Sequence, residues 1–260
     1  MMSSSMPDGI DLQAMLADKD DRDYVRHALS LFYNQRPDMH VHNGIAEIHL
    51  YGPMLFDASP IELGMGATAY EEIREEIQLA NEDDEVQAVI LVCNTPGGTV
   101  QGIEEVYQDI KSSSKPFYAY VETSATSAGY YLASACENIT VSPSSVSGNI
   151  GTVLTYWDLT EVYEAMGAKQ EVFTNEGATL KGTFAKPLSD EQRVFVQAMV
   201  DEIGEQFKAR VLENRPDVDP EVFKAGWYSP EKAGELGLVD YEGTLAELRG
   251  MILTNNANNP

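Results

Sequence analysis

The fold is decided by a stretch that reads Thr-Ser-Ala-Thr-Ser-Ala-Gly-Tyr-Tyr, residues 123–131. It follows a strand-like run, 116–122, and precedes a helix-like run, 130–136, so we interpret it as a strand-to-helix turn with Ser127 at the bend. The first N–H groups of a helix have no intrahelical acceptor and can bind an anion that develops beside that hydroxyl. Ser127 is the candidate nucleophile. The competing interpretation is a helix N-cap, a common role for serine.

A second feature is the continuous apolar run Gln-Ala-Val-Ile-Leu-Val-Cys, residues 87–93, which is typical of a parallel strand buried on both faces. It ends in Asn-Thr-Pro-Gly-Gly, residues 94–98. Paired glycines let the backbone approach a ligand closely, and open α/β sheets bind ligands at the carboxyl edge of their strands. We therefore expect an oxyanion to be held by the N–H groups of Gly97 and Ala128, with Gly98 as a further donor.

Working outward, strand patterns alternate with helix patterns along the chain, which predicts βαβ units and a mainly parallel sheet. Two short helices are expected within residues 11–33. The division that we expect is an N-terminal helical arm, 1–42, a catalytic domain, 43–254, and a disordered tail, 255–260. The remaining elements are predicted as strands at 45–51, 138–142 and 170–174, helices at 67–81, 101–112, 158–166, 189–212, 219–225 and 229–236, and irregular segments at 52–66, 144–153 and 176–188.

Composition narrows the class of protein. The 260 residues, 43% of them hydrophobic, suffice for one α/β domain. The net charge of −25 repels phosphate backbones and anionic lipid heads, so neither nucleic acid nor a membrane surface is an expected partner. Cys93 and Cys136 lie in apolar runs and are interpreted as core side chains. The chain shows no secretory leader and no apolar run near ~20 residues, which predicts a cytoplasmic protein without a membrane anchor.

Three ordered motifs resemble the signal peptide peptidase A family of serine peptidases. The motifs are Asn-Thr-Pro-Gly-Gly at 94–98, Ser-Ala-Gly-Tyr-Tyr at 127–131, and the segment 142–153. The resemblance covers residues 45–239 and implies an α/β, crotonase-like or Clp-protease-like ββα spiral with a Ser-Lys dyad. The chain departs from the family at Ala128, where glycine is usual, and at Asn149, where serine is usual.

The base that activates the serine is sought among histidines and lysines, because a hydroxyl is a poor nucleophile without one. In Clp proteases the base follows the serine, whereas no histidine follows Ser127, so a histidine triad in that order is excluded. Lys181, within Gly-Ala-Thr-Leu-Lys-Gly at 177–182, stands where the family keeps its lysine base. Lys186 is the second candidate, and an exposed loop lysine is the alternative for both.

A lysine base must be neutral near pH 7, so its pKa has to fall by about three from an ordinary value of about 10.4, which corresponds to ~4 kcal/mol. Desolvation can supply that change. We therefore expect Lys181 to be buried without a carboxylate partner.

The resemblance implies a serine endopeptidase without metal or cofactor that acts on polypeptides and assembles into rings or domes, in which serine and lysine can come from adjacent protomers. We expect a phage head-maturation peptidase acting on capsid or scaffold proteins, in the host cytoplasm or the procapsid. A soluble signal-peptide or general peptide hydrolase, a crotonase-like acyl-CoA enzyme and a non-catalytic shell component are the alternatives. The substrate cleft is predicted to include Tyr130, Tyr131 and the loop 144–151, with Ser147, Gly148 and Asn149 in that loop; core packing and turn formation are the alternatives.

Overall fold

The computed structural model describes residues 39–182 and 186–258, so the predicted helices within 11–33 lie outside the described residues. The strands are β1 (His40–His42), β2 (Ile45–Tyr51), β3 (Met54–Leu55), β4 (Thr68–Ala69), β5 (Ala88–Thr95), β6 (Phe117–Thr126), β7 (Asn138–Val141), β8 (Val146–Gly148), β9 (Trp227–Tyr228) and β10 (Tyr241–Glu242). The helices are α3 (Pro60–Gly64), α4 (Tyr70–Glu82), α5 (Ile103–Ser112), α6 (Ala128–Ala133), α7 (Thr160–Ala165), α8 (Asp190–Asn214), the 3₁₀ helix η1 (Pro220–Lys224), α9 (Pro230–Glu235) and α10 (Leu245–Asn258).

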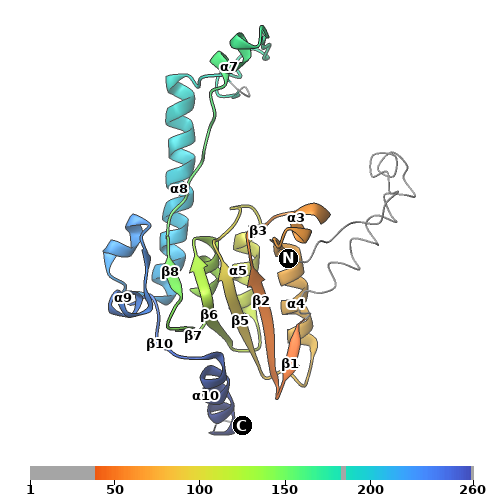
Figure 1. Cartoon of the computed structure of the whole chain (residues 1–260), viewed down its shortest axis with the longest axis vertical. Coiled ribbons are helices and arrows are strands. Elements are labelled where there is room, and N and C mark those ends of the chain that lie inside the picture. The colour runs from red at the N-terminus through yellow and green to blue at the C-terminus, as the bar shows by residue number, and fades with distance from the viewer. Residues whose placement is uncertain (1–38, 183–185, 259–260) are drawn as a thin grey trace, which may run out of the picture.

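The main sheet has the strand order β1-β2-β5-β6-β7-β10, with β8 continuing beside β6 and β9 beside β8 (Figure 1). Its central neighbours are all parallel, and the antiparallel pairs are β1 with β2 and β8 with β9. The apolar run in β5 is buried on both faces, as its sequence predicted. The structure therefore confirms an α/β fold with a mainly parallel sheet.

The two faces of the sheet are covered differently. One face packs against α4, α5, α6 and the C-terminal part of α8 in a large apolar core. The other carries a smaller cluster, in which Leu248 and Ile252, one turn apart on α10, cover Ile45 and Ile90. Cys93 and Cys136 are buried and form no disulfide, and burial raises the pKa of the Cys93 thiol to about 12.

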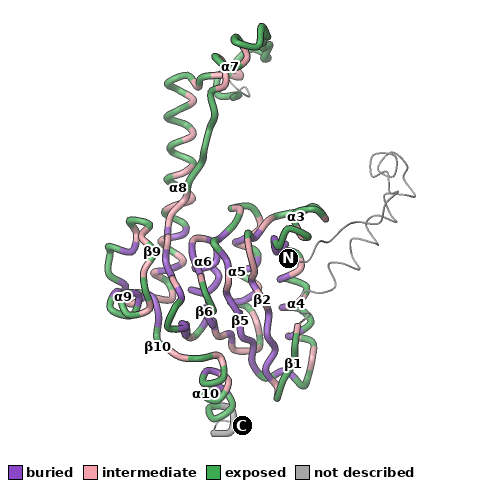
Figure 2. Tube along the Cα trace, in the orientation of Figure 1, coloured by how far each residue is buried: buried purple, intermediate pink, exposed green. Residues whose placement is uncertain are grey.

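A long arm rises from this body. It consists of residues 152–182 and 186–188 together with the N-terminal half of α8, and α7 lies at its far end (Figure 1). Figure 2 shows that the arm is largely exposed, whereas α8 becomes buried at Phe207 and Val211, where it meets the body. The helix begins as predicted, with a capping box between Ser189 and Gln192. Within the described residues, no helix combines the length and the hydropathy required to cross a bilayer.

Several predicted elements were wrong. Residues 170–174 are not a strand: among the described residues, no strand pairs with this exposed part of the arm. The segment 144–153 contains β8, and 52–66 contains β3 and α3. These strands pair with residues distant in sequence, such as Gly148 with Trp227, and a local pattern does not show such partners. Helix α10 was not predicted and extends into the segment 255–260 that was expected to be a disordered tail.

Candidate active site

Ser127 stands at the junction of β6 and α6, with its backbone at φ 53° and ψ −123°. A positive φ is rare for a residue with a side chain and is strained. Two hydrogen bonds at 2.9 Å hold the residue there: its N–H donates to the carbonyl of Gly148, and its own carbonyl accepts from the N–H of Tyr131. The half-buried hydroxyl is thus carried on a rigid turn, in the way expected from the sequence.

The glycine pair approaches this turn closely. A Cβ on Gly97, whose φ is 113°, would lie 2.7 Å from the Cβ of Ser127, and a Cβ on Gly98 would lie 1.9 Å from the carbonyl oxygen of Met54. Only glycine therefore allows this loop to run beside both the serine and β3. The N–H of Gly97 donates to Thr95 Oγ1 at 3.1 Å, which pins the loop to the end of β5.

Two N–H groups remain beside Ser127. Met54 donates to the carbonyl of Gly97 and accepts from the N–H of Thr99, both at 2.9 Å, so the N–H of Gly98 between them points away from β3. The N–H of Ala128 belongs to the first turn of α6 and has no intrahelical acceptor. Neither group has an acceptor among the described residues. Gly98 and Ala128 are thus the donors that the geometry leaves available.

The predicted cleft residues separate into two groups. Residues Ser147, Gly148 and Asn149 run along and just beyond β8, directly beside the serine turn; the Ser147 hydroxyl is buried without a partner among the described residues. Tyr130 was predicted wrongly, because it is fully buried and its hydroxyl donates to the carbonyl of Leu238 at 2.7 Å. Its neighbour Tyr131, which was predicted for the cleft together with it, does border the site.

A hollow of about 70 Å³ opens beside Ser127. It lies between the glycine loop, the first turns of α5 and α6, the backbone at 151–152, and one face of α8. Its residues are Gly98, Thr99, Val100, Ile103, Glu104, Ser127, Ala128, Tyr131, Gly151, Thr152, Ile203, Gln206 and Phe207.

No pattern in the sequence indicated that Ile103, Ile203 and Phe207 would border the serine. The spacing of Ile203, Phe207 and Val211 at four-residue intervals was the signal for a buried face on α8, although nothing in the sequence said which elements it would meet.

The floor of the hollow is an ion-paired network. Glu104 accepts from Arg210 and from the Tyr131 hydroxyl, so α5, α6 and α8 are tied together at one point. Burial opposes ionisation of Glu104, but the hydrogen bonds from Arg210, Tyr131 and Gln108 outweigh it and lower the pKa of this carboxyl. Burial, and then the contact with Glu104, raise the pKa of the Tyr131 hydroxyl.

The two candidate lysines lie at the other end of the arm. Lys181 is exposed, and its carbonyl accepts from Gln192 Nε2, in the first turn of α8, at 3.1 Å. Phe207, beside Ser127, lies about four turns further along the same helix, which places Lys181 roughly 20 Å away within one chain. Lys186 Nζ donates to the carbonyl of Gln170 at 2.8 Å, also in the arm. The two predicted dyad members are therefore not brought together within one chain.

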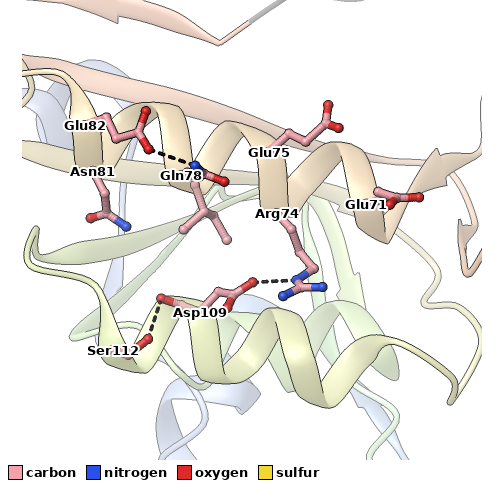
Figure 3. A pocket seen from close by; sticks show the side chains of 9 residues that line it. Glu71, Arg74, Glu75, Gln78, Asn81, Glu82, Asp109 and Ser112 are labelled. Atoms are coloured by element: carbon pink, nitrogen blue, oxygen red, sulfur yellow. Dashed lines mark hydrogen bonds and ion pairs between the residues drawn. The ribbon is translucent and has the colours of Figure 1, made fainter.

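Another hollow, of about 450 Å³, lies between α4 and α5 and has a different character (Figure 3). Its walls are polar, and an ion pair between Arg74 and Asp109 crosses it at 2.6 Å. It contains no residue at a strained turn and shares no lining residue with the hollow at Ser127. The two hollows are thus separate, and the candidate site is the one at Ser127.

The site thus combines a serine on a strained turn with two unused backbone donors beside it, at the carboxyl edge of a parallel sheet. The chain belongs to peptidase family S49, whose profile matches residues 109–253, more than half of its length. It is thus classed among the serine peptidases. A second profile, the N-terminal domain of NfeD1b, matches residues 59–156.

Two curated relatives and one solved structure illustrate the similarity. The chain is 27% identical over 208 residues to "Serine protease SPPA, chloroplastic" of Arabidopsis thaliana, covering 78% of this chain and 31% of that protein. It is 27% identical over 207 residues to "Capsid assembly protease C" of Escherichia phage lambda, covering 77% and 46%. The chain thus spans less than half the length of these two relatives.

An enoyl-CoA hydratase from Shewanella pealeana matches the structure with a TM-score of 0.50 at 10% identity, over 89% of this chain and 78% of that one. Identity this low shows the fold alone, and the fold is the crotonase-like one that the sequence predicted.

Proposed function

We propose that the chain hydrolyses peptide bonds with Ser127 as nucleophile and Lys181 of a second copy as base. The observation that carries the proposal is the strained turn at Ser127, which faces the free N–H groups of Gly98 and Ala128. Such a turn positions an oxygen nucleophile within reach of two donors, and strain of this kind is retained mainly at functional sites.

The reaction follows from this geometry. Lys181 Nζ accepts the proton of the Ser127 hydroxyl as Oγ attacks the peptide carbonyl. The N–H groups of Gly98 and Ala128 stabilise the oxyanion, each contributing about 3 kcal/mol. The lysine then protonates the leaving amine, and water hydrolyses the acyl-enzyme. The N–H of Gly97 is bonded to Thr95 and is not an oxyanion donor. The role of Gly97 is to let the loop pass close to Ser127.

The lysine has to come from another copy because Lys181 is roughly 20 Å from Ser127 along α8. Support comes from the exposed apolar side chains of the arm, including Val153, Trp157 and Phe173 at 86%, 70% and 90% exposure. Apolar surface of this extent favours burial against a partner. We propose a closed ring or dome, in which each arm reaches the serine site of a neighbour and the contact strips water from the amine.

For the substrate, we propose capsid or scaffold proteins of a phage, cleaved in the host cytoplasm or inside the procapsid. The similarity to the lambda capsid assembly protease supports this proposal. A signal-peptide or general peptide hydrolase is the alternative within the class. The fold shared with an enoyl-CoA hydratase favours an acyl-CoA enzyme as the alternative outside it.

Mixing two inactive variants tests the dyad. Ser127→Ala and Lys181→Ala should each lose at least about 10⁴-fold in casein hydrolysis, because members of one catalytic unit fail together. In a ring, a one-to-one mixture should recover about a quarter of wild-type activity, since half the serine sites are intact and half of those meet an intact lysine. Lys186→Ala is the control and should stay active.

Four results would contradict the proposal. Full activity of Lys181→Ala would show that Lys181 is not the base. An inactive mixture of variants that assemble normally would show that the serine and the lysine do not meet between copies. Hydration of crotonyl-CoA by wild type and by both variants, without labelling of Ser127 by a fluorophosphonate, would indicate an acyl-CoA enzyme. No labelling and no turnover in an assembled particle would indicate a shell component.

A further inference from the structure

The hollow beside Ser127 is too small for a large side chain. An engineered protein cavity of about 150 Å³ binds one benzene molecule, and one water occupies about 30 Å³ of the liquid. At about 70 Å³, the hollow has room for a few heavy atoms. It borders the nucleophile and the donor Ala128, so the side chain that enters it belongs to the substrate residue whose carbonyl is attacked, termed P1.

The side chains that form the walls of the hollow are tightly packed and cannot easily move to enlarge it. Ile103, Tyr131 and Phe207 are buried, with at most 7% of each residue exposed. The Tyr131 ring packs edge-on against Tyr107, with centroids 5.4 Å apart, and against Phe207 at 5.0 Å. Such packed aromatic groups resist displacement, because overpacking a dense core is destabilising.

The one carboxylate that lines the hollow among the described residues, Glu104, is not available to pair with a basic substrate side chain. Glu104 Oε1 accepts from Arg210 Nη2, and Oε2 accepts from the Tyr131 hydroxyl and from Arg210 Nε. A second ion pair joins Arg210 to Glu213 at 2.9 Å. Because both carboxylate oxygens are already occupied, a lysine or arginine at P1 would find neither space nor a partner.

We infer that this hollow is the P1 subsite and that it selects small uncharged residues, namely Gly, Ala and Ser, with Phe207 and Ile203 of α8 setting its depth. This inference rests on the proposed peptidase function. Discrimination against one or two extra methylenes in a closed apolar site amounts to about 10- to 200-fold in kcat/KM. Helix α8 therefore carries both the specificity wall and, at its other end, the loop with Lys181.

The test begins with a proteome-derived peptide library digested by the full-length assembled protein, with cleavage sites identified by mass spectrometry. Ser127-dependent sites should carry Gly, Ala or Ser at P1. Matched synthetic peptides based on the best site should then show kcat/KM at least about tenfold higher with Ala than with Leu at P1.

Variants of α8 locate the selectivity. Phe207→Ala should open the hollow and lower the Ala-to-Leu ratio at least about tenfold. Ile203→Ala changes a half-buried residue of the wall and should lower the ratio as well. It replaces Phe207→Ala as the test if that variant does not fold. Val211→Ala is the matched control, because this buried residue lies one turn further along α8, outside the hollow, and the ratio should stay at the wild-type value.

Two results overturn the inference in distinguishable ways. Ser127-dependent sites dominated by Leu, Phe, Lys or Arg at P1, or an unchanged ratio in folded Phe207→Ala and Ile203→Ala, would contradict the subsite while leaving the peptidase intact. Absence of any Ser127-dependent cleavage of the library would contradict the peptidase and the subsite together.

Discussion

At the scale of single residues, the site depends on two backbone conformations that are costly elsewhere. Ser127 at φ 53° and Gly97 at φ 113° face one another across a gap that a single added methyl group would close. Glycine adopts its conformation freely, whereas the strain at Ser127 costs about 1–3 kcal/mol and persists because the surrounding bonds hold it. Those bonds come from Gly148, Tyr131 and Thr95. The serine site is therefore rigid before any substrate arrives.

We predict that Gly97→Ala is more harmful than Gly66→Ala. Both glycines have positive φ, at 113° and 93°, but among the described residues a Cβ on Gly97 would meet other atoms, whereas one on Gly66 would have none within 4 Å. Backbone strain should destabilise both variants by about 1–2 kcal/mol. The clash with Ser127 should add at least about 1 kcal/mol and reduce kcat. Urea unfolding and casein hydrolysis measure the two effects, and equal losses in both variants would refute the steric argument.

At the scale of elements, α10 covers one face of the sheet with a small cluster and one ion pair. Arg249 donates to both carboxylate oxygens of Glu47, at 2.5 and 2.7 Å, and the Glu47 side chain is only 7% exposed. The ion pair in Figure 3, between Arg74 on α4 and Asp109 on α5, has side chains that are 48% and 32% exposed. The Arg249 pair is bidentate and its carboxylate is buried, whereas the Arg74 pair has one hydrogen bond and is open to water, so the two pairs should contribute differently to stability.

We predict that Arg249→Ala lowers the free energy of unfolding by about 3 kcal/mol, because it leaves the buried Glu47 carboxylate without a partner. Arg74→Ala, the control, should cost at most about 1 kcal/mol, because water solvates Asp109. Urea titrations at pH 7 give both values. Adding Glu47→Gln to Arg249→Ala should restore part of the loss. Equal effects of the two arginine substitutions would show that burial of Glu47 is unimportant.

At the scale of the whole molecule, the predicted nucleophile Ser127 and the predicted base Lys181 lie at opposite ends of one long arm. The body holds the serine, the oxyanion donors and the hollow, whereas the arm carries Lys181 and a set of exposed apolar side chains (Figure 2). If the proposed dyad forms, its serine and its lysine come from neighbouring copies. Activity is then expected to rise with protein concentration as assembly proceeds.

We predict that Trp157→Asp dissociates the assembly and abolishes hydrolysis, because a charge at this 70% exposed side chain would have to be desolvated in the contact between copies. Leu79→Asp is the control: Leu79 is 55% exposed on α4, outside the arm, and the variant should assemble and cleave normally. Sedimentation velocity and casein hydrolysis over a concentration series test both. A fully active monomer of the Trp157 variant would contradict the arrangement between copies.

The sequence by itself determined the features that depend on neighbouring residues. Strand patterns predicted β2 and β5, a helix pattern predicted the start of α8 near residue 189, and the turn residues predicted the junction at Ser127. Each of these follows from local backbone preference and periodicity. The order of strands and helices followed as well, because parallel strands require crossovers between them.

Only the tertiary structure decided which distant residues meet. It placed Ile203 and Phe207 of α8 beside Ser127, directed Tyr131 to the hollow and Tyr130 into the core, and left Lys181 at the far end of the arm. It also formed β8 from a segment rich in serine and glycine by pairing that segment with β6 and β9. The physical reason is that packing and strand pairing across long sequence separations depend on which surfaces bury one another, and no local pattern carries that information.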